Sequence, residues 1–408
     1  MKYINRSLEK KFLRMSSFFK AVLVTGARQV GKTTMLKHLA GEQKRTYVSL
    51  DNLTIRNLAQ TDPVLFFQTY KTPIIIDEVQ YAPQLFNQIK IICDNSDEKG
   101  LFWLTGSQQY SMMKNVRESL AGRLGIMQLY SLTNNEKNGI EYKNTLDFSL
   151  PCLLERQAVS ERNDIIKVFR HIWEGGMPET ISAGNEQRKA YYDSYIDTYL
   201  MRDATEYGKI QDSLSFRRFL AACASIVSQQ LNFKTLAEAA DISQPTAKVW
   251  VRLLEGMGII YLLKPYFNNE MKRLTKTPKI YFFDTGLCAH LSMWLTADTL
   301  MMGAANGRYF ENYVVIEIVK NYSYSQMNVN VTYFRDSNAK EIDIFVEGNN
   351  MIHPLEIKKS ANPDVREVRK FNVLDKTQIN RSFGGVICMC EEVVPIDDKN
   401  CIIPCNLI

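Results

Sequence analysis

Residues 21–40, AVLVTGARQVGKTTMLKHLA, combine a short apolar strand, a loop bounded by glycines and the start of a helix. Residues 26–33 match the pattern G-x-x-x-x-G-K-[ST], which is typical of loops that bind nucleotide phosphates. The two glycines let backbone amides wrap around the phosphates, and the following helix directs its positive end at them. We expect Lys32 to reach the β- and γ-phosphates and the Thr33 hydroxyl to ligate Mg²⁺. The residues expected to bind ATP are Gly26, Ala27, Arg28, Gln29, Val30, Gly31, Lys32, Thr33 and Thr34.

A second motif lies downstream, in the segment TPIIIDEVQ at residues 72–80. Its isoleucines predict a buried strand, and two carboxylates follow at the carboxyl end, where ligands collect in open α/β sheets. We expect Asp77 to hold the magnesium ion and Glu78 to orient or deprotonate the attacking water. A protein that only binds nucleotide has no need of Glu78, so the pair predicts hydrolysis.

Two further segments could contribute to the same site. GLFWLTGSQQ, residues 100–109, predicts another strand, and Ser107 after it could either lie beside the γ-phosphate or cap the next helix. RESLAGRLG, residues 117–125, carries Arg117 and Arg123. We prefer Arg123 as an arginine finger, acting in its own chain or towards a neighbouring subunit.

Taken together, the phosphate loop, the DEVQ of residues 77–80, LTGSQQ and SLAGR resemble the uncharacterised bacterial and archaeal ATPases of the AAA+ superfamily. In that family a C-terminal companion domain of unknown function follows the ATPase. The resemblance implies a five-stranded parallel sheet with the Mg²⁺–ATP site at its strand ends, formed by Walker A and Walker B motifs. It assigns these roles to Lys32, Thr33, Asp77, Glu78, Ser107 and Arg123. A second sensor arginine is not evident, so the resemblance does not extend to a standard hexamer, although a homo-oligomer is possible.

The composition sets limits on localisation and partners. The chain has 408 residues, a net charge of +6 and a pI near 8.7, values that permit nucleic-acid contact without arguing for it. We found neither an apolar run long enough to cross a bilayer nor the apolar core of a secretory signal. The eight cysteines are scattered and lack metal-ligand spacing. We therefore expect reduced thiols in a cytoplasmic protein without a membrane partner.

The segment at residues 233–267 predicts a winged helix-turn-helix: a short helix, a tight turn, a second helix and a strand. The second helix could enter a DNA groove, and its outward residues would be Gln244, Thr246, Lys248 and Arg252. Basic residues of the following segment could contact phosphates: Lys272, Arg273, Lys276 and Lys279. Winged helices also serve as protein-docking modules, and both roles remain open here.

Two strands near the C-terminus carry alternating charges. In KEIDIFV, residues 340–346, and HPLEIKK, residues 353–359, one face of each strand is apolar and the other acidic or basic. Antiparallel pairing would bring Asp343 beside Glu356. The arrangement resembles the PD-(D/E)xK nuclease fold. That resemblance assigns a metal site to Glu311, Asp343 and Glu356, with Lys358 assisting. Alternatively, these charged residues form the solvent-exposed face of an ordinary hairpin. The nuclease family also has many inactive members.

These segments predict an α/β chain in four parts: a P-loop NTPase of AAA type with a parallel sheet at 1–135, a helical connector at 136–212, a winged helix-turn-helix at 213–300 and an α/β restriction-endonuclease-like domain at 301–408. The leading hypothesis is a Mg²⁺-dependent ATPase coupled to a DNA-binding module. The alternatives are a nucleotide-gated protein-interaction switch with an inactive nuclease-like domain, and an active nuclease with an ATP-controlled gate.

Overall fold

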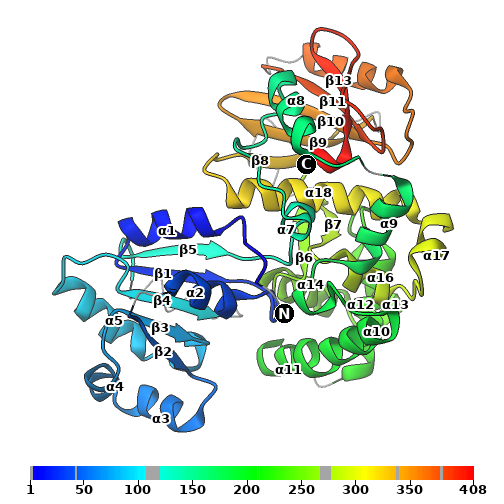
Figure 1. Ribbon diagram of the computed structural model, residues 1–408. Coiled ribbons are helices and arrows are strands. Elements are labelled where there is room, and N and C mark those ends of the chain that lie inside the picture. Colours follow the sequence, from blue (N-terminus) through cyan, green and yellow to red (C-terminus); the bar gives the residue numbers. More distant parts are fainter. Residues whose placement is uncertain are drawn as a thin grey trace. The chain divides into compact units, whose positions relative to one another are not determined.

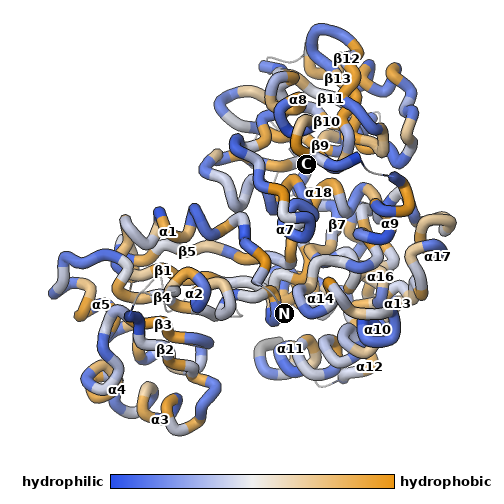
Figure 2. Tube along the Cα trace, viewed as in Figure 1, coloured by the Kyte–Doolittle hydropathy of each residue, from blue (hydrophilic) through white to orange (hydrophobic). Residues whose placement is uncertain are grey.

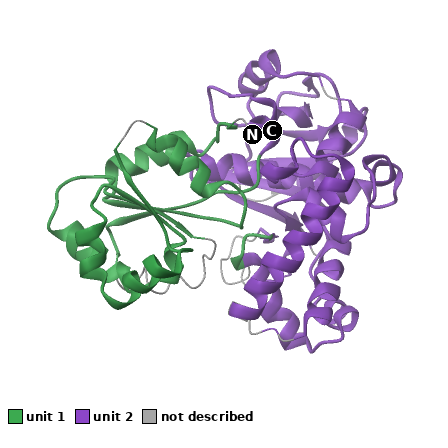
Figure 3. Ribbon diagram, turned by 60° about the horizontal axis from the view of Figure 1, so that its bottom comes forward, with its two compact units in different colours: residues 1–132, 256–259 green, residues 133–255, 260–408 purple. Residues whose placement is uncertain are grey.

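The computed structural model describes residues 3–41, 44–106, 120–162, 164–208, 210, 212–266, 277–336, 340–376 and 380–408. The chain divides into two compact units, which are coloured green and purple in Figure 3. Unit 1 comprises residues 1–132 and 256–259, and unit 2 comprises residues 133–255 and 260–408. The finer division into four domains stays a prediction.

Unit 1 is built on a five-stranded parallel sheet with the strand order β2-β3-β4-β1-β5. The strands are β1 (Ala21–Thr25), β2 (Thr46–Ser49), β3 (Ile74–Asp77), β4 (Phe102–Gly106) and β5 (Leu124–Gln128). The central strands are fully buried, because helices cover both faces of a parallel sheet. Figure 2 shows hydrophobic residues along these strands. The predicted P-loop fold with a parallel sheet is confirmed.

Apart from α1, which precedes β1, the described helices of unit 1 connect successive strands of the sheet. They are α1 (Glu9–Phe18), α2 (Lys32–Ala40), α3 (Leu53–Thr61), α4 (Pro63–Thr69) and α5 (Leu85–Asp94). Strand β1 lies between β4 and β5. The connection from β1 to β2 and the connection from β4 to β5 therefore run towards opposite edges of the sheet. Such a switch point at the carboxyl ends of the strands is where α/β sheets bind ligands. The phosphate loop follows β1 directly.

The first part of unit 2 is helical (Figure 1). Its helices are α7 (Asn134–Asn138), α8 (Leu150–Val159), α9 (Ile165–Glu174), α10 (Asn185–Ser194), α11 (Met201–Gly208), α12 (Ser213–Ser225), α13 (Phe233–Ala240), α14 (Gln244–Gly256), α16 (Thr285–Leu291), α17 (Ala297–Met302) and α18 (Asn306–Tyr324). A π-helical stretch, Tyr195–Leu200, connects α10 to α11.

A buried aspartate explains the two glycines in HIWEGGMPET, residues 171–180, a sequence that begins in the last turn of α9. Asp284 is 4% exposed and accepts hydrogen bonds from the Gly176 amide (2.7 Å), the Tyr192 hydroxyl (2.7 Å) and the Leu287 amide (2.8 Å). Gly175 has a φ of 72°, and a Cβ atom there would lie 2.6 Å from the Asp284 carboxylate. This close approach requires glycine, and it ties the end of α9 to the start of α16.

The two helices predicted for this segment, and the turn between them, are present as α13 and α14. Asp241 adopts a left-handed conformation with a φ of 55°, which ends α13 and leads into α14. Trp250 of α14 packs edge-on against Phe216 and Phe219 of α12, which anchors the second helix. Two antiparallel strands follow, β6 (Ile260–Leu263) and β7 (Lys279–Phe282). The predicted basic residues Lys272, Arg273 and Lys276 between them lie outside the described residues.

The C-terminal part of unit 2 is a six-stranded mixed sheet with the order β12-β13-β11-β10-β9-β8. Its strands are β8 (Asn330–Arg335), β9 (Glu341–Gly348), β10 (Met351–Ile357), β11 (Gly384–Cys388), β12 (Val394–Pro395) and β13 (Asn400–Pro404). Strands β8, β9 and β10 are antiparallel neighbours, whereas β10, β11 and β13 run parallel. A 3₁₀ helix, Val365–Lys376, lies between β10 and β11 in sequence. The sheet domain at the C-terminus agrees with the predicted α/β class.

Two sequence-based expectations about chemistry can be compared with this fold. All eight cysteines are free thiols, and seven of them are buried. Among the described helices, none is both long enough and apolar enough to cross a bilayer.

Candidate functional site

The phosphate loop joins β1 to α2 through backbone conformations that favour glycine. Gly26 has a φ of 144°, and a Cβ atom there would lie 2.1 Å from the Leu129 carbonyl oxygen. Gly31, at the start of α2, has a φ of 94°. Gln29 also lies in the left-handed region, with a φ of 61°. The loop therefore curves tightly, with the amino end of α2 at its close, as expected for a phosphate-binding loop.

Lys32 lies against this loop. Its side chain is 6% exposed, and its ammonium donates hydrogen bonds to the carbonyl oxygens of Gly26 (3.1 Å) and Ala27 (2.8 Å). These contacts hold the positive charge over the loop rather than in solvent. The position suits a lysine that exchanges carbonyl contacts for phosphate oxygens.

Asp77, at the carboxyl end of β3, connects four structural elements. The Thr33 hydroxyl donates to its Oδ1 atom at 2.6 Å, and the Tyr47 hydroxyl of β2 donates to Oδ2 at 3.1 Å. The Thr105 hydroxyl of β4 also donates to Oδ1. Asp77 is 7% exposed, so the carboxylate is fixed by these three hydroxyls and not by solvent. The pairing of Thr33 with Asp77 places two hard oxygen donors together, which is the donor set that Mg²⁺ prefers.

Glu78 follows Asp77 in a strained backbone conformation. Its φ of 57° lies in the left-handed region, which is rare for a residue that is not glycine. The Glu78 amide donates to the Thr105 hydroxyl at 3.1 Å, and the Gln80 amide group donates to the Glu78 carboxylate. Strain of this kind concentrates at functional sites. Thr105 thus bonds to both members of the acidic pair.

The charge at the strand ends is negative. Asp51 lies just beyond β2, and burial together with the charges of Glu78 and Asp77 raises its pKa. Burial and the Asp77 charge also raise the pKa of Tyr47 to about 12. The positive charge of a divalent cation would relieve this repulsion between the carboxylates. Mg²⁺ suits the site because it binds through few protein ligands and retains water. Sequence reasoning missed Tyr47 and Asp51, because the sequence alone does not show that β2 pairs with β3.

Two further residues were predicted to contribute to this site, Ser107 and Arg123. Ser107 lies outside the described residues. Arg123 precedes β5, which runs parallel to β1, so it lies at the amino ends of the strands and the phosphate loop at the carboxyl ends. Five residues of strand span roughly 16 Å. The Arg123 guanidinium instead pairs with Asp94, with 3.2 Å between Nη2 and Oδ2. The expectation of an arginine finger within the same chain is therefore wrong, and a role towards a neighbouring subunit stays a prediction.

The carboxylates of the C-terminal sheet lie on adjacent strands. In the antiparallel register of β9 and β10, Ile344 faces Leu355, which brings Asp343 next to Glu356. The Ile357 amide donates to the Asp343 carboxylate at 2.8 Å. The adjacency expected from the sequence is thus present.

A buried lysine occupies one end of this acidic cluster. The Lys279 ammonium lies 3.1 Å from Glu311, 2.6 Å from Glu341 and 4.0 Å from Asp343, measured to carboxylate oxygens. Its side chain is 5% exposed, so the expected contact between Lys279 and a DNA phosphate is wrong. Burial, followed by the charge of Asp343, raises the pKa of Glu311 to about 7. Lys279 therefore acts as the internal counter-ion of this cluster.

The other end of the cluster is also paired. Glu356 is 2% exposed, and its Oε1 atom accepts hydrogen bonds from Lys358 (2.7 Å) and Lys370 (2.5 Å). Burial, with the charge of Asp343, raises the pKa of Glu356. Within the described ranges, no group of three or more His, Cys, Asp or Glu side chains is arranged to hold a metal ion. A metal-binding role for Glu311, Asp343 and Glu356, with Lys358, stays a prediction.

Comparison with known proteins gives the first part of the chain a family. Residues 18–138 match the family model described as an AAA domain. These residues form an AAA-type P-loop domain. Its fold supports ATP binding and hydrolysis. Residues 166–298 and 306–408 match two further models, both described as domains of unknown function, DUF8612 and DUF4143. The second is consistent with a C-terminal companion of the AAA domain.

The chain also resembles individual proteins along most of its length. It is 27% identical over 391 residues to uncharacterised proteins of Mycobacterium tuberculosis (Rv2008c) and Mycobacterium bovis (Mb2031c), covering 95% of this chain and 80% of each relative. Among solved structures, a Walker-type ATPase of Pyrococcus abyssi matches 71% of this chain and 96% of its own, with 14% identity and a TM-score of 0.46. The Holliday junction branch migration motor RuvB of Thermotoga maritima matches 63% and 89%, with 17% identity and a TM-score of 0.33. Both structural likenesses are weak.

The double role of Thr105 in the AAA domain gives a testable prediction. Thr105→Val keeps the branched shape and removes only the hydroxyl that bonds to Asp77 and to the Glu78 amide. Loss of a group that orients a metal ligand typically costs about 10- to 100-fold in activity. We expect kcat for ATP hydrolysis to fall within that range while the thermal unfolding midpoint changes little. Ser16→Ala, at a buried hydroxyl that bonds to Trp103 in the same unit, is the control and should retain activity. Unchanged turnover in Thr105→Val would contradict the assignment.

Proposed function

We propose that this chain is a magnesium-dependent ATPase whose active site is formed by Lys32, Thr33, Asp77 and Glu78. The main support is the 2.6 Å hydrogen bond between the Thr33 hydroxyl and Asp77, because it joins the helix after the phosphate loop to the acidic strand end. Chance matches to either motif alone would have no reason to meet in space.

Each residue has one role in the proposed reaction. Lys32 and the loop amides bind the β- and γ-phosphates and offset their negative charge. Thr33 and Asp77 would hold Mg²⁺, which would supply positive charge to offset the negative charge that develops on the phosphates. Glu78 orients the attacking water and accepts its proton. The Gln80 amide and the Thr105 hydroxyl fix the position of Glu78.

A phosphate-release assay on the purified chain with Mg²⁺ and ATP tests this proposal. Lys32→Ala should abolish ATP binding, because the phosphates lose their buried counter-charge. Glu78→Gln should bind ATP normally but turn over about 10²- to 10⁴-fold more slowly, the usual contribution of a general base. Glu98→Gln, at an exposed carboxylate of the same unit, is the matched control. Wild-type turnover rates in Glu78→Gln would contradict the assigned role.

We further propose that nucleotide state is coupled to the helix-turn-helix through residues 256–259. This segment belongs to unit 1, although it follows α14 and precedes β6 in the sequence. Gly258 has a φ of 72°, and a Cβ atom there would lie 3.5 Å from the Ala27 amide nitrogen and 3.2 Å from the Gln128 side chain. Ala27 is part of the phosphate loop. A shift of the loop on phosphate binding would therefore displace residues 256–259, the segment that continues from α14.

The exposed face of α14 supports nucleic acid as the coupled partner. Gln244, Lys248 and Arg252 are exposed and recur every four residues, so they share one face of the helix. Thr246, also predicted to point outward, is half-buried. Two cations and an amide are suitable for phosphate and base-edge contacts by the second helix of a helix-turn-helix.

Adding double-stranded DNA to the phosphate-release assay tests the coupling. We expect ATP turnover to rise several-fold and the rise to disappear in Lys248→Ala/Arg252→Ala. Gly258→Ala should also lose the response, because a side chain at this φ costs about 1 kcal/mol and strains the contact with the loop. Gly139→Ala is the matched control, since Gly139 has a φ of 66° but open space around it. Turnover that is intact and indifferent to DNA and RNA would refute nucleic-acid coupling.

A second candidate, a nucleotide-gated protein-interaction switch with an inactive nuclease-like domain, is favoured by Lys279. The lysine supplies inside the protein the positive charge that a divalent cation would bring to Glu311, Glu341 and Asp343. A bound metal and this ammonium would compete for the same carboxylate oxygens. This candidate retains the ATPase and predicts slow hydrolysis.

Manganese titration without nucleotide distinguishes an inactive nuclease-like domain from an active nuclease. The Asp77→Asn background removes the ATP-site ligand, so that only the C-terminal cluster is tested. We expect no Mn²⁺ binding there, and a gain of one site, with a higher unfolding midpoint on adding Mn²⁺, in Lys279→Ala. Removing one partner of a buried ion pair costs about 3–5 kcal/mol, so the variant itself should be less stable. Lys340→Ala, at an exposed lysine near β9, should gain no site. Mn²⁺ binding that Glu356→Gln abolishes would instead support the nuclease.

A further inference from the structure

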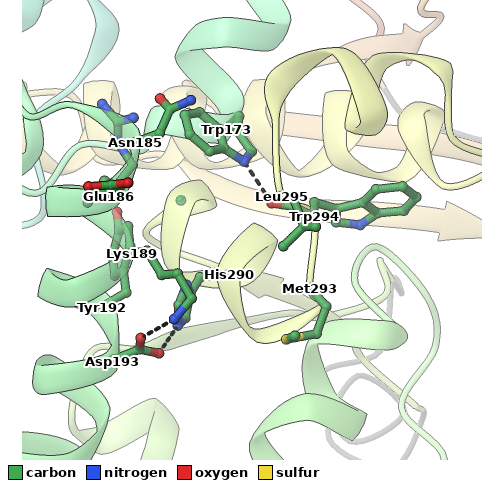
Figure 4. Close-up of a pocket in the computed structure, with 12 residues that line it drawn as sticks. Trp173, Asn185, Glu186, Lys189, Tyr192, Asp193, His290, Met293, Trp294 and Leu295 are labelled. Carbon is green, nitrogen blue, oxygen red and sulfur yellow. Dashed lines mark hydrogen bonds and ion pairs between the residues drawn. The ribbon is translucent and has the colours of Figure 1, made fainter.

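The helical part of unit 2 contains a cavity of about 280 Å³ that the ATPase does not use. It opens between α10 and the chain that follows α16, with α9 behind them. Figure 4 shows Lys189, Tyr192 and Asp193 along α10, facing Trp173 and the segment of Met293, Trp294 and Leu295. The cavity lies entirely within residues 166–298, which match a domain of unknown function.

The walls of the cavity are largely apolar and are held in place. The Trp173 ring nitrogen donates to the Trp294 carbonyl oxygen at 2.8 Å, which fixes one indole. The Arg188 guanidinium lies over the face of the Trp173 ring, 4.7 Å from its centroid. Arg188 is itself buried and donates to the carbonyl oxygens of Thr180 (3.2 Å) and Ala183 (3.1 Å). The site is therefore preformed.

The rim is apolar and exposed to a degree unusual for such side chains. Met293 is 74% exposed and Leu295 is 67% exposed. Met293 also has a φ of 60°, a conformation that costs free energy in a residue other than glycine. Adjacent exposed apolar side chains next to a preformed cavity mark interaction sites, and methionine is favoured at surfaces that adapt to partners.

Most of the charges around the cavity are already paired with each other. Asp193 contacts both the Lys189 ammonium and the His290 ring nitrogen Nε2, each at 2.9 Å. Burial lowers the pKa of His290, which favours the neutral form of its ring. Glu186 differs, because it is exposed and no hydrogen bond or ion pair is seen for it in the described part of the chain. The interior thus suits an uncharged group, and its edge suits a cation.

We propose that this cavity binds a partner polypeptide through an apolar anchor side chain, aromatic or long aliphatic, that is followed by a basic residue near Glu186. A small molecule confined to the cavity would leave the outward-facing side chains of Met293 and Leu295 in water. A polypeptide covers them while it inserts one side chain. The site binds its partner whether or not the chain hydrolyses ATP, so its failure and that of the proposed ATPase are separate results.

Ligand-detected NMR on the full chain, with short capped peptides as probes, tests the site. N-acetyl-Phe-Lys-amide should bind in the millimolar range, as expected for one buried side chain. N-acetyl-Ser-Lys-amide should not bind, and N-acetyl-Phe-Glu-amide should bind a few-fold more weakly than the lysine peptide. That difference should vanish in Glu186→Gln. Met293→Asp should weaken binding at least tenfold, since aspartate tolerates this backbone conformation but puts a charge at the apolar rim.

Met302→Asp is the matched control, because Met302 is 82% exposed but does not line the cavity. It should bind the lysine peptide like the wild type and unfold at the same temperature as Met293→Asp. The proposal is overturned if no Phe peptide binds, if the serine peptide binds equally well, or if the two methionine variants lose binding alike. A wild-type dimer that Met293→Asp dissociates would also overturn it, in favour of a second copy of this chain as the occupant.

Discussion

The carboxylate of Asp77 is the interaction on which the ATP site depends. Three hydroxyl groups, from Thr33, Tyr47 and Thr105, converge on it from three other elements of unit 1. Because the strands are parallel, their carboxyl ends meet at one edge, and β1 leads into the phosphate loop at that same edge. A short buried aspartate can serve all three hydroxyls only if the sheet has this strand order. The strand order of unit 1 therefore determines the geometry of the ATP site.

In unit 2, buried acidic groups mainly stabilise the fold. Asp284 accepts three hydrogen bonds and joins two helices, and the cluster around Asp343 is neutralised by lysines on both sides. Removing buried carboxylates from water is costly unless they are paired, and Lys279 and Lys370 provide that pairing. The same side chains that resemble a nuclease centre thus have a structural use, which is why their pattern alone does not establish catalysis.

The sequence predicted those features that local spacing determines. The phosphate loop, the acidic end of β3 and the turn between α13 and α14 each depend on residues close together in the chain. The alternation of apolar and charged residues in β9 and β10 also predicted which side chains share a face. Arg123 and Lys279 could not be placed in this way. The position of Arg123 depends on which end of β5 faces the nucleotide, and that of Lys279 on its packing against α18 and β9, some 30 to 60 residues away in sequence.

The central claim is that Thr33 and Asp77 hold the metal of a bound nucleotide. Electron paramagnetic resonance of Mn²⁺, titrated into the chain with a non-hydrolysable ATP analogue, measures this directly. The account predicts one tightly bound Mn²⁺ per chain only when the analogue is present, and a loss of at least tenfold in its affinity in Asp77→Asn. Equal Mn²⁺ affinity in the wild type and in Asp77→Asn, with the analogue bound in both, would contradict it.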